Sequence, residues 1–191
     1  EWAEMQEQPR TGAGFVELVD RLRARGYLSH ALLDDASAAA WVGALEQSDG
    51  YSFAASYAGH SAARVEEVFT TMIDQERRAG SDAAPELLVS AVGDDEQFAA
   101  AAALLARHWG LDSRVVVGVR TPAADEVPGI PACDEVCTGA NMSAWVEVRS
   151  QGGAWLPIDV TPQFAMLPSA ITEGEQLPEH PTVPEQRSEE R

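Results

Sequence analysis

Acidic side chains gather at the start of one predicted helix. The stretch GDDEQFAAAAALLARHWGL, which begins at Gly93, places Asp94, Asp95 and Glu96 directly before a run of alanine and leucine. Asp94 and Gln97 have the spacing of a capping box, in which each side chain binds the backbone N–H of the other residue. The helix dipole also stabilises negative charge in the first turn. A nucleophile would be activated at the same place, so Asp95 is a candidate for either a structural or a chemical role.

The two cysteines are the next candidates for chemistry. Cys133 and Cys137 lie four positions apart in the loop VPGIPACDEVCTG. A zinc site needs further ligands, and neither a second cysteine pair nor a nearby histidine accompanies these two. The spacing leaves two alternatives open, a local disulfide in an oxidising compartment and a pair of free thiols. His60 and His108 are expected to cap a helix and to complement a helix dipole rather than to bind a metal.

Several stretches have the periodicity of helices that would position these residues. GFVELVDRLRARG is expected to end at Gly26, and SAARVEEVFTTMIDQERRAG is expected to begin at Ser61 and to end at Gly80. The helix that follows Asp94 should end at Gly110, and the alanine-rich residues 29–50 are a further candidate of mixed periodicity. The side chains expected to face the core are Phe15, Leu18, Val19, Leu22, Val65, Val68, Phe69, Met72, Ile73, Phe98, Ala102, Leu105 and Trp109.

The second half of the chain has the patterns of strands. SRVVVGV, residues 113–119, is a continuous β-branched run, which is typical of a strand buried on both faces. SAWVEVRS alternates apolar and polar side chains, and QGG turns it into AWLPIDV, which predicts an antiparallel hairpin. Because helices precede strands, we expect an α+β fold with N-terminal helices packed on an antiparallel β-sheet.

Length and composition indicate one core with polar ends. The 191 residues, 45% of them hydrophobic, suit a single domain over residues 12–166, after a polar lead-in at residues 1–11. Residues 167–191, rich in Pro and Glu, are expected to be a disordered linker. This is an acidic protein with a net charge of -18, which disfavours nucleic acid as a partner. No apolar run reaches the ~20 residues of a membrane helix, and the missing initiator Met suggests a fragment.

Four blocks of the second half carry a family resemblance. They are GDDEQFA from Gly93, LAR through RVVVG from Leu105, SAWVEV from Ser143, and WLPIDVTP from Trp155. In this order and spacing they resemble the transglutaminase-like domains of bacteria, a branch of the papain-like superfamily, over about residues 86–165. AGHSAARVEE, leading into GDDEQ, is similar to actinobacterial relatives that are outward-facing domains of multi-pass membrane proteins.

The resemblance implies a papain-like core and a site of three residues. In such families Cys begins the helix and is the nucleophile, His is the base, and Asp orients the His. Here those positions hold Asp95, Ser143 and Asp159, so only the aspartate keeps its family identity. No cofactor and no metal is implied. The side chains expected to line the cleft or bind a ligand are Trp145, Trp155 and Gln97.

These replacements predict a domain without the family chemistry. Asp95 should be ionised and poorly nucleophilic toward an amide, and Ser143 cannot act as a base near neutral pH. We therefore expect a pseudoenzyme that binds a peptide or cell-envelope ligand or supports assembly. It is expected on the extracytoplasmic face of the cell membrane, anchored through segments outside this chain.

Two alternatives remain open. The first is an acyl-transfer enzyme for amide or peptide bonds, related to transglutaminases or cysteine proteases, which would use Asp95, Ser143 and Asp159 or the thiol of Cys137. The second is a Ca²⁺ site, which requires carboxylate and backbone oxygens to converge at ~2.4 Å from one point. The carboxylates in question are Asp94, Asp95, Glu96 and Asp159.

Overall fold

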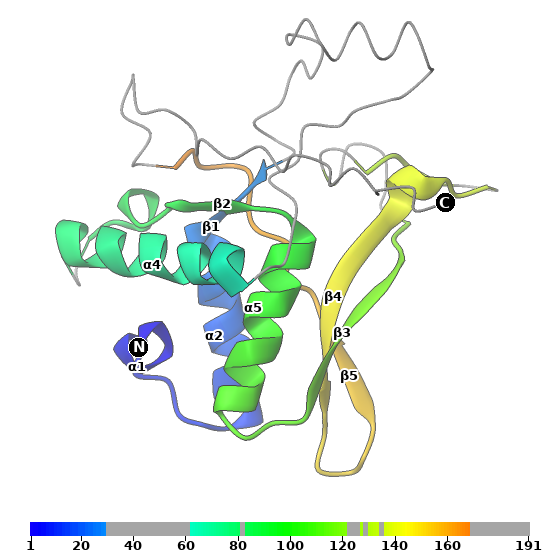
Figure 1. Cartoon of the computed structure of the whole chain (residues 1–191), viewed down its shortest axis with the longest axis horizontal. Coiled ribbons are helices and arrows are strands. Elements are labelled where there is room, and N and C mark those ends of the chain that lie inside the picture. The colour runs from blue at the N-terminus through cyan, green and yellow to red at the C-terminus, as the bar shows by residue number, and fades with distance from the viewer. Residues whose placement is uncertain (30–61, 81–82, 122–126, 128–129, 134–135, 169–191) are drawn as a thin grey trace, which may run out of the picture.

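The computed structural model describes residues 1–29, 62–80, 83–121, 127, 130–133 and 136–168, and it has an α+β architecture (Figure 1). The helices are α1 (Trp2–Met5), α2 (Gly12–Arg25), α4 (Ala62–Ala79) and α5 (Asp95–His108), with short 3-10 turns η3 (Pro85–Leu87) and η4 (Gly139–Asn141). The strands are β1 (Gly26–Leu28), β2 (Ala91–Gly93), β3 (Ser113–Val119), β4 (Met142–Arg149) and β5 (Trp155–Ile158). β1 pairs with β2 in parallel, and β3, β4 and β5 form an antiparallel sheet in that order. The predicted α+β class and antiparallel sheet are confirmed.

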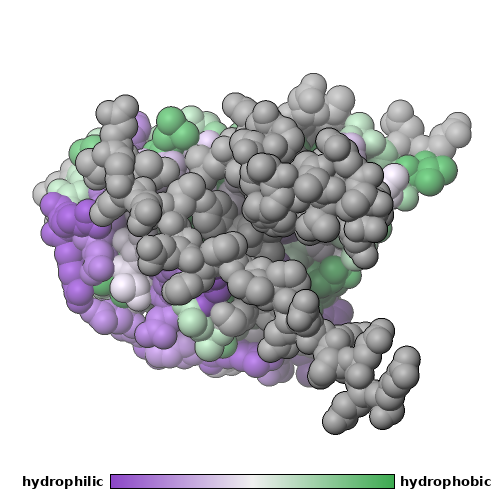
Figure 2. All heavy atoms as spheres, turned by 45° about the horizontal axis from the view of Figure 1, so that its top comes forward, coloured by the Kyte–Doolittle hydropathy of each residue, from purple (hydrophilic) through white to green (hydrophobic). Residues whose placement is uncertain are grey.

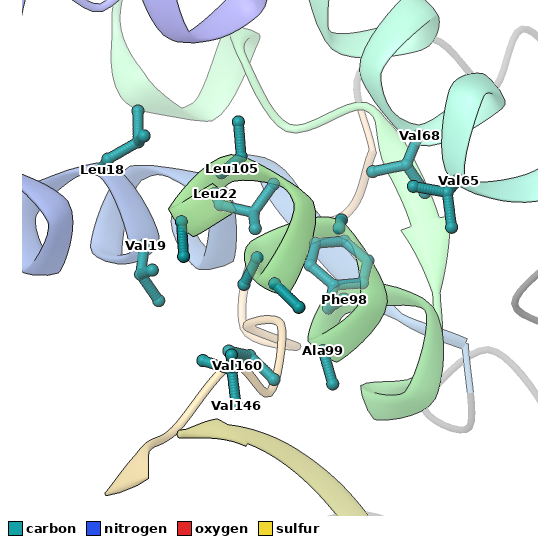
Figure 3. Packing of buried hydrophobic residues seen from close by; sticks show 14 of the residues in the cluster. Leu18, Val19, Leu22, Val65, Val68, Phe98, Ala99, Leu105, Val146 and Val160 are labelled. Atoms are coloured by element: carbon teal, nitrogen blue, oxygen red, sulfur yellow. The ribbon is translucent and has the colours of Figure 1, made fainter. Parts of the chain in front are cut away.

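Helix α5 lies at the centre of the molecule, between α2 and β4 (Figure 1). Its many alanines allow close packing, and Ala99, Ala102 and Ala106 are completely buried. Phe98 supplies the largest side chain of this helix to the core and is also completely buried. Figure 3 shows α5 surrounded by side chains of other elements: Leu18, Val19 and Leu22 of α2, Val65 and Val68 of α4, and Val146 of β4. The helix therefore joins the helical half of the core to the sheet.

The helix ends follow the signals in the sequence. The hydroxyl of Thr11 caps α2 by accepting a hydrogen bond from the backbone N–H of Gly14 at 3.1 Å. Helix α2 ends before Gly26 and α4 ends before Gly80, as predicted. Gly80 has a φ of +88°, a left-handed conformation that glycine adopts without strain. The predicted cap at Ser61, together with His60 and the candidate helix from residue 30 onward, lies outside the described residues.

The first eleven residues are more than a polar lead-in, because they contain α1 and a core side chain. Trp2 is 2% exposed, and its indole N–H donates to Glu76 of α4 at 3.0 Å. Arg25 of α2 forms an ion pair with the same carboxylate, and both side chains are largely buried. Gln6 completes the network by donating to Glu76 at 3.1 Å and accepting from Arg25 at 2.6 Å. These partners are far apart in the sequence, so no local pattern indicated them.

The sheet confirms one strand prediction and corrects another. The alternation in β4 is confirmed, because Ala144, Val146 and Val148 are buried on the side of α5. The prediction that β3 is buried on both faces is wrong. β3 lies at the edge of the sheet, and α5 packs mainly on β4, so three valines of β3 remain exposed. They are Val115, Val117 and Val119, with Val117 at 61%.

The visible surface is mainly hydrophilic on the side of the helices. In Figure 2, hydrophilic residues form a continuous area along the side on which α4 lies, and the hydrophobic areas are smaller and separate. Within the part of the chain that the structure describes, no helix combines the length and the apolar character needed to cross a membrane.

Candidate functional site

The N-terminus of α5 carries the capping box that the sequence predicts. Oδ1 of Asp94 accepts from the backbone N–H of Gln97 at 2.9 Å, and Oε1 of Gln97 accepts from the backbone N–H of Asp94 at 3.1 Å. This exchange fixes the helix start, so that Asp95 is the first helical residue. Gln97 was expected to line a cleft, but it is 2% exposed and holds the end of the helix instead.

Asp95 and Ser143 lie in contact although 48 positions separate them. The hydroxyl of Ser143 donates to Oδ2 of Asp95, and the backbone N–H of Ala144 donates to the same oxygen at 2.7 Å. One carboxylate oxygen thus joins the first turn of α5 to the start of β4. Ser143 is 4% exposed, so this contact is shielded from solvent on the serine side. The structure therefore brings together two of the three predicted site residues.

Asp159, the third predicted residue, follows β5 and has other partners. Its Oδ1 accepts from the backbone N–H of Thr161 at 3.1 Å and from the Thr161 hydroxyl at 2.8 Å. Its Oδ2 lies 3.0 Å from Nη2 of Arg23, and its Oδ1 lies 3.3 Å from Nη1 of Arg120. Burial favours a higher pKa, but the Thr161 hydrogen bonds and the two arginines hold the pKa of Asp159 below its ordinary value. Among the described residues, neither Asp95 nor Ser143 contacts this carboxylate.

The two arginines beside Asp159 were not identified from the sequence. Arg23 lies in the last turn of α2, and its Nε donates to the carbonyl oxygen of Thr161 at 3.0 Å. Arg120 directly follows β3, and its Nη1 donates to the hydroxyl of Thr161. The sequence contains one weak signal, the arginine that ends the run SRVVVGVR, and nothing in it connects Arg23 with a residue more than a hundred positions away.

A comparison with protein-family models gives a match for residues 40–160, to the transglutaminase-like superfamily. The chain belongs to this superfamily. The match covers more than half of the chain and includes Asp95, Ser143 and Asp159, whereas Arg23 and the whole of α2 lie outside it. Neither the curated proteins nor the solved structures give a significant match to the chain.

Two cavities of this transglutaminase-like domain meet at Arg120 and Asp159, which line both of them. The larger, of about 450 Å³, lies between α2 and residues 159–165, and its other lining residues include Arg23, Val127, Thr161 and Phe164. The smaller, of about 360 Å³, has otherwise apolar or aromatic walls formed by Val119, Trp145, Pro157 and Ile158. The domain therefore has a charged compartment beside an apolar one, with an arginine and an aspartate at the boundary.

Trp145 was expected to line a cleft, and it forms part of the smaller cavity. Its ring packs against Gly118 so closely that a Cβ there would lie 2.5 Å from Cη2 of the ring. Gly118 is the cross-strand partner of Ser143, so the tryptophan lies beside the Asp95–Ser143 contact in the sheet register. The indole N–H of Trp145 is buried and has no hydrogen-bond partner among the described residues.

Trp155 was also expected in the cleft, but it lines neither of the two cavities described above. The guanidinium of Arg114 lies 4.4 Å from the centre of its ring, in the geometry of a cation–π contact. Arg114 in turn donates through Nε to Glu147 at 2.7 Å. Trp155 thus belongs to a polar contact on the surface of the sheet.

Other residues singled out in the sequence are also placed by the structure. Cys133 and Cys137 form a disulfide, which removes Cys137 as a free thiol. Nε2 of His108 lies 2.6 Å from Oε1 of Glu4, at the C-terminal end of α5 where a histidine complements the dipole. Cys137 and His108 are therefore both engaged in contacts away from Asp95 and Ser143.

The carboxylate cluster considered for Ca²⁺ does not form. Asp94 caps α5, Asp95 accepts from Ser143, and Asp159 faces two arginines. Within the described part of the chain, no three His, Cys, Asp or Glu side chains converge on a position suited to a metal ion. The alternative of a shared calcium site therefore has no support among the described residues.

Proposed function

We propose that this transglutaminase-like domain is a catalytically inactive module that binds a ligand or supports assembly on the extracytoplasmic face of a cell membrane. The contact between Asp95 and Ser143 carries the proposal. At the two positions where the resemblance places a thiol and an imidazole, the protein has a carboxylate and a hydroxyl that bind each other.

The bonding of Asp95 supports the loss of acyl transfer. A nucleophile must offer an electron pair to a carbonyl carbon, and a neighbouring base must accept a proton. Oδ2 of Asp95 already accepts two hydrogen bonds, which stabilise its charge in the ground state and weaken it as a nucleophile. Ser143 has no imidazole to activate its hydroxyl. Loss of both a nucleophile and its base typically removes several powers of ten in rate.

The surroundings of Asp159 support the same conclusion. In the family mechanism an aspartate holds and orients the imidazolium. Here two guanidinium groups neutralise the aspartate, and one of them, Arg23, comes from a helix outside the matched region. An aspartate engaged in this way supports the architecture of the cavities rather than a proton relay.

The disulfide supports a location outside the cytoplasm. Disulfides persist in oxidising compartments and are rare in the cytosol, and Cys133 is joined to Cys137. The similarity of AGHSAARVEE to outward-facing domains of actinobacterial membrane proteins favours the same location. We infer that segments outside this chain anchor it and that its ligand is a peptide or a component of the cell envelope.

The test of inactivity is a set of three assays on the purified protein: amine incorporation into a glutamine peptide, deamidation of that peptide, and peptide hydrolysis. We expect no turnover above buffer for the natural chain, for Asp95→Asn, or for the exposed control Asp112→Asn. Turnover that disappears in Asp95→Asn but persists in the control would overturn the proposal in favour of an acyl-transfer enzyme. Turnover abolished by iodoacetamide would also overturn it, because such turnover would require a free thiol from the Cys133–Cys137 pair.

The assignment of the two positions has its own test. The double variant Asp95→Cys with Ser143→His should place sulfur and imidazole within hydrogen-bond reach, because the native side chains are already bonded. We expect its thiol to react with iodoacetamide at a lower pH than the thiol of Asp95→Cys alone, since an imidazolium favours the thiolate. Identical pH profiles for the two variants would show that the positions do not correspond.

The location is tested in cells that make the whole natural protein. Protease added outside intact cells should digest this domain, whereas a cytosolic marker stays intact. Digestion only after lysis would place the domain on the wrong side of the membrane and overturn this part of the proposal.

A further inference from the structure

Among the described residues, the partners of Arg120 all bind one nitrogen of its guanidinium. Its Nη1 contacts Asp159 and the hydroxyl of Thr161, whereas none of the described residues contacts its Nε or Nη2. These two nitrogens form the edge that binds a carboxylate through two parallel hydrogen bonds. The side chain is 28% exposed and borders both cavities. The ion pair with Asp159 therefore fixes a donor fork that a ligand can reach.

The smaller cavity offers a place for an apolar group next to this fork. At about 360 Å³ it falls within the ~300–1,000 Å³ of small-ligand sites. Its apolar walls come from Val119, Trp145, Pro157 and Ile158. The indole N–H of Trp145 is buried and has no partner among the described residues, so its NMR signal can report a ligand that packs against this tryptophan.

The charged side chains around Nε and Nη2 of Arg120 favour a ligand with one negative charge over a ligand with two. Arg23 and Arg120 face Asp159. Nη1 of Arg23 also lies 3.6 Å from Oδ1 of Asp20. Two positive and two negative side chains nearly cancel, so the local field gives little support to a dianion. The net charge of -18 on the whole chain opposes highly charged anions further. A monoanion with an apolar body is the chemistry that suits both compartments.

We propose that the two cavities bind the C-terminal carboxylate of a peptide that ends in a hydrophobic residue. The Nε–Nη2 edge of Arg120 holds the carboxylate, and the last side chain of the peptide lies in the smaller cavity against Trp145. The preceding residues of the peptide extend into the larger cavity. This inference rests on the proposed function, because it names the ligand class of the binding module.

The experiment follows the indole N–H signal of Trp145 by NMR in the ¹⁵N-labelled chain, with Trp145→Phe to assign it. The probes are acetyl-Ala-Ala-Phe with a free carboxylate and the same peptide as its C-terminal amide. We expect the acid to shift this signal in a saturable manner and to bind at least about tenfold more tightly than the amide, because a charge-assisted bidentate contact is lost. 3-Phenylpropionate, a small organic acid without peptide bonds, should bind more weakly than the peptide acid.

Variants of Arg120 identify the donor. Arg120→Lys keeps the charge beside Asp159 but lacks the fork, so it should lose the preference for acid over amide while the remaining spectrum shows an intact fold. Arg149→Gln, an exposed arginine on β4, is the matched control and should keep the preference. Equal binding of acid and amide, or a preference unchanged in Arg120→Lys, would overturn the carboxylate site.

Two further outcomes separate this inference from the proposed function. Equally tight binding of 3-phenylpropionate, or of inorganic phosphate, would overturn the peptide ligand and leave a general anion site. No shift with any probe would overturn the site as a whole. Neither result affects the turnover assays, which test catalytic inactivity alone.

Discussion

Asp95 and Asp159 are both aspartates of the region matched to the transglutaminase-like superfamily, yet they have different kinds of partner. Asp95 is held by uncharged donors, the hydroxyl of Ser143 and the N–H of Ala144, in a contact between α5 and β4. Asp159 is 40% exposed and faces two arginines at the meeting point of two cavities. The first carboxylate joins two elements of the fold, whereas the second lies with two guanidinium groups on the walls of the cavities.

This difference bears on the proposed function, in which the site no longer carries out acyl transfer but still binds a ligand. Removal of the Asp95 carboxylate costs stability because Ser143 and Ala144, the residues that donate to it, are buried. A carboxylate in an exposed ion pair, such as Asp159, contributes little to stability. Substitutions at the two positions should therefore have different effects on stability and binding.

The largest effect is expected for Asp95→Ala. The change leaves the Ser143 hydroxyl and the Ala144 N–H without their acceptor, and each unsatisfied buried donor costs ~1–3 kcal/mol. We expect the free energy of unfolding to fall by about 3 kcal/mol in urea denaturation. The exposed control Asp112→Ala should change it by less than about 0.5 kcal/mol. A similar small loss in both variants would mean that the contact of Asp95 is not structural.

A smaller effect on stability is expected for Gly118→Ala. Gly118 pairs with Ser143 across the strands and packs against Trp145, which lines the smaller cavity. The new methyl group would lie 2.5 Å from the Trp145 ring, so the ring must move. Overpacking of this kind costs ~1–3 kcal/mol, and movement of an indole also changes its fluorescence maximum. We expect both a loss of stability and a spectral shift. The picture of the ring on Gly118 is wrong if the variant matches the natural chain in both measurements.

The expected effect of Asp159→Asn is smaller still and depends on pH. Because the pKa of Asp159 is lower in the folded protein than in the unfolded chain, its stabilisation is present above the unfolded value of ~3.9. It is lost as the pH falls through the lower folded value. Solvent screening limits the contribution to about 1 kcal/mol. Urea denaturation at pH 7 should show this loss, and the two proteins should converge in strong acid; a difference that grows toward low pH would contradict the sign.

The smallest effect is expected for Arg114→Ala on the surface of the sheet. Its cation–π contact with Trp155 and its ion pair with Glu147 are both exposed, and such contacts contribute ~0.5–1 kcal/mol or less. We expect a loss of about 0.5 kcal/mol that shrinks in 1 M salt. This variant measures how much the contacts of an exposed arginine contribute to the free energy of unfolding. A loss as large as that of Asp95→Ala would remove the contrast between buried and exposed contacts.

The parts of the fold that sequence alone predicts are those fixed by neighbouring residues. The Asp94–Gln97 capping box, the stops at Gly26 and Gly80, and the alternation along β4 are local signals, and all are confirmed. The exposure of β3 was not predictable in this way. Valines suit a central strand and an edge strand equally, and only the position of α5 over β4 decides between them.

The same distinction between local and long-range contacts explains which residues of the candidate site could be predicted from the sequence. Motif order placed Asp95 and Ser143 at positions that lie in contact in the structure. It did not identify Arg23 and Arg120, because an arginine on a helix or at the end of a strand pairs with whatever the tertiary structure brings near it. It also placed Gln97 in a cleft, whereas its side chain is buried and binds the backbone N–H of Asp94.

The network of Trp2, Gln6, Arg25 and Glu76 affects where the domain can be trimmed. The family match begins at residue 40, yet α1 and α2 precede it and supply Trp2 and four buried side chains of α2 to the core. A recombinant version trimmed to residues 40–160 would leave Phe98 uncovered and Glu76 without its arginine. Expression and domain-swapping experiments should therefore begin upstream of the homology boundary.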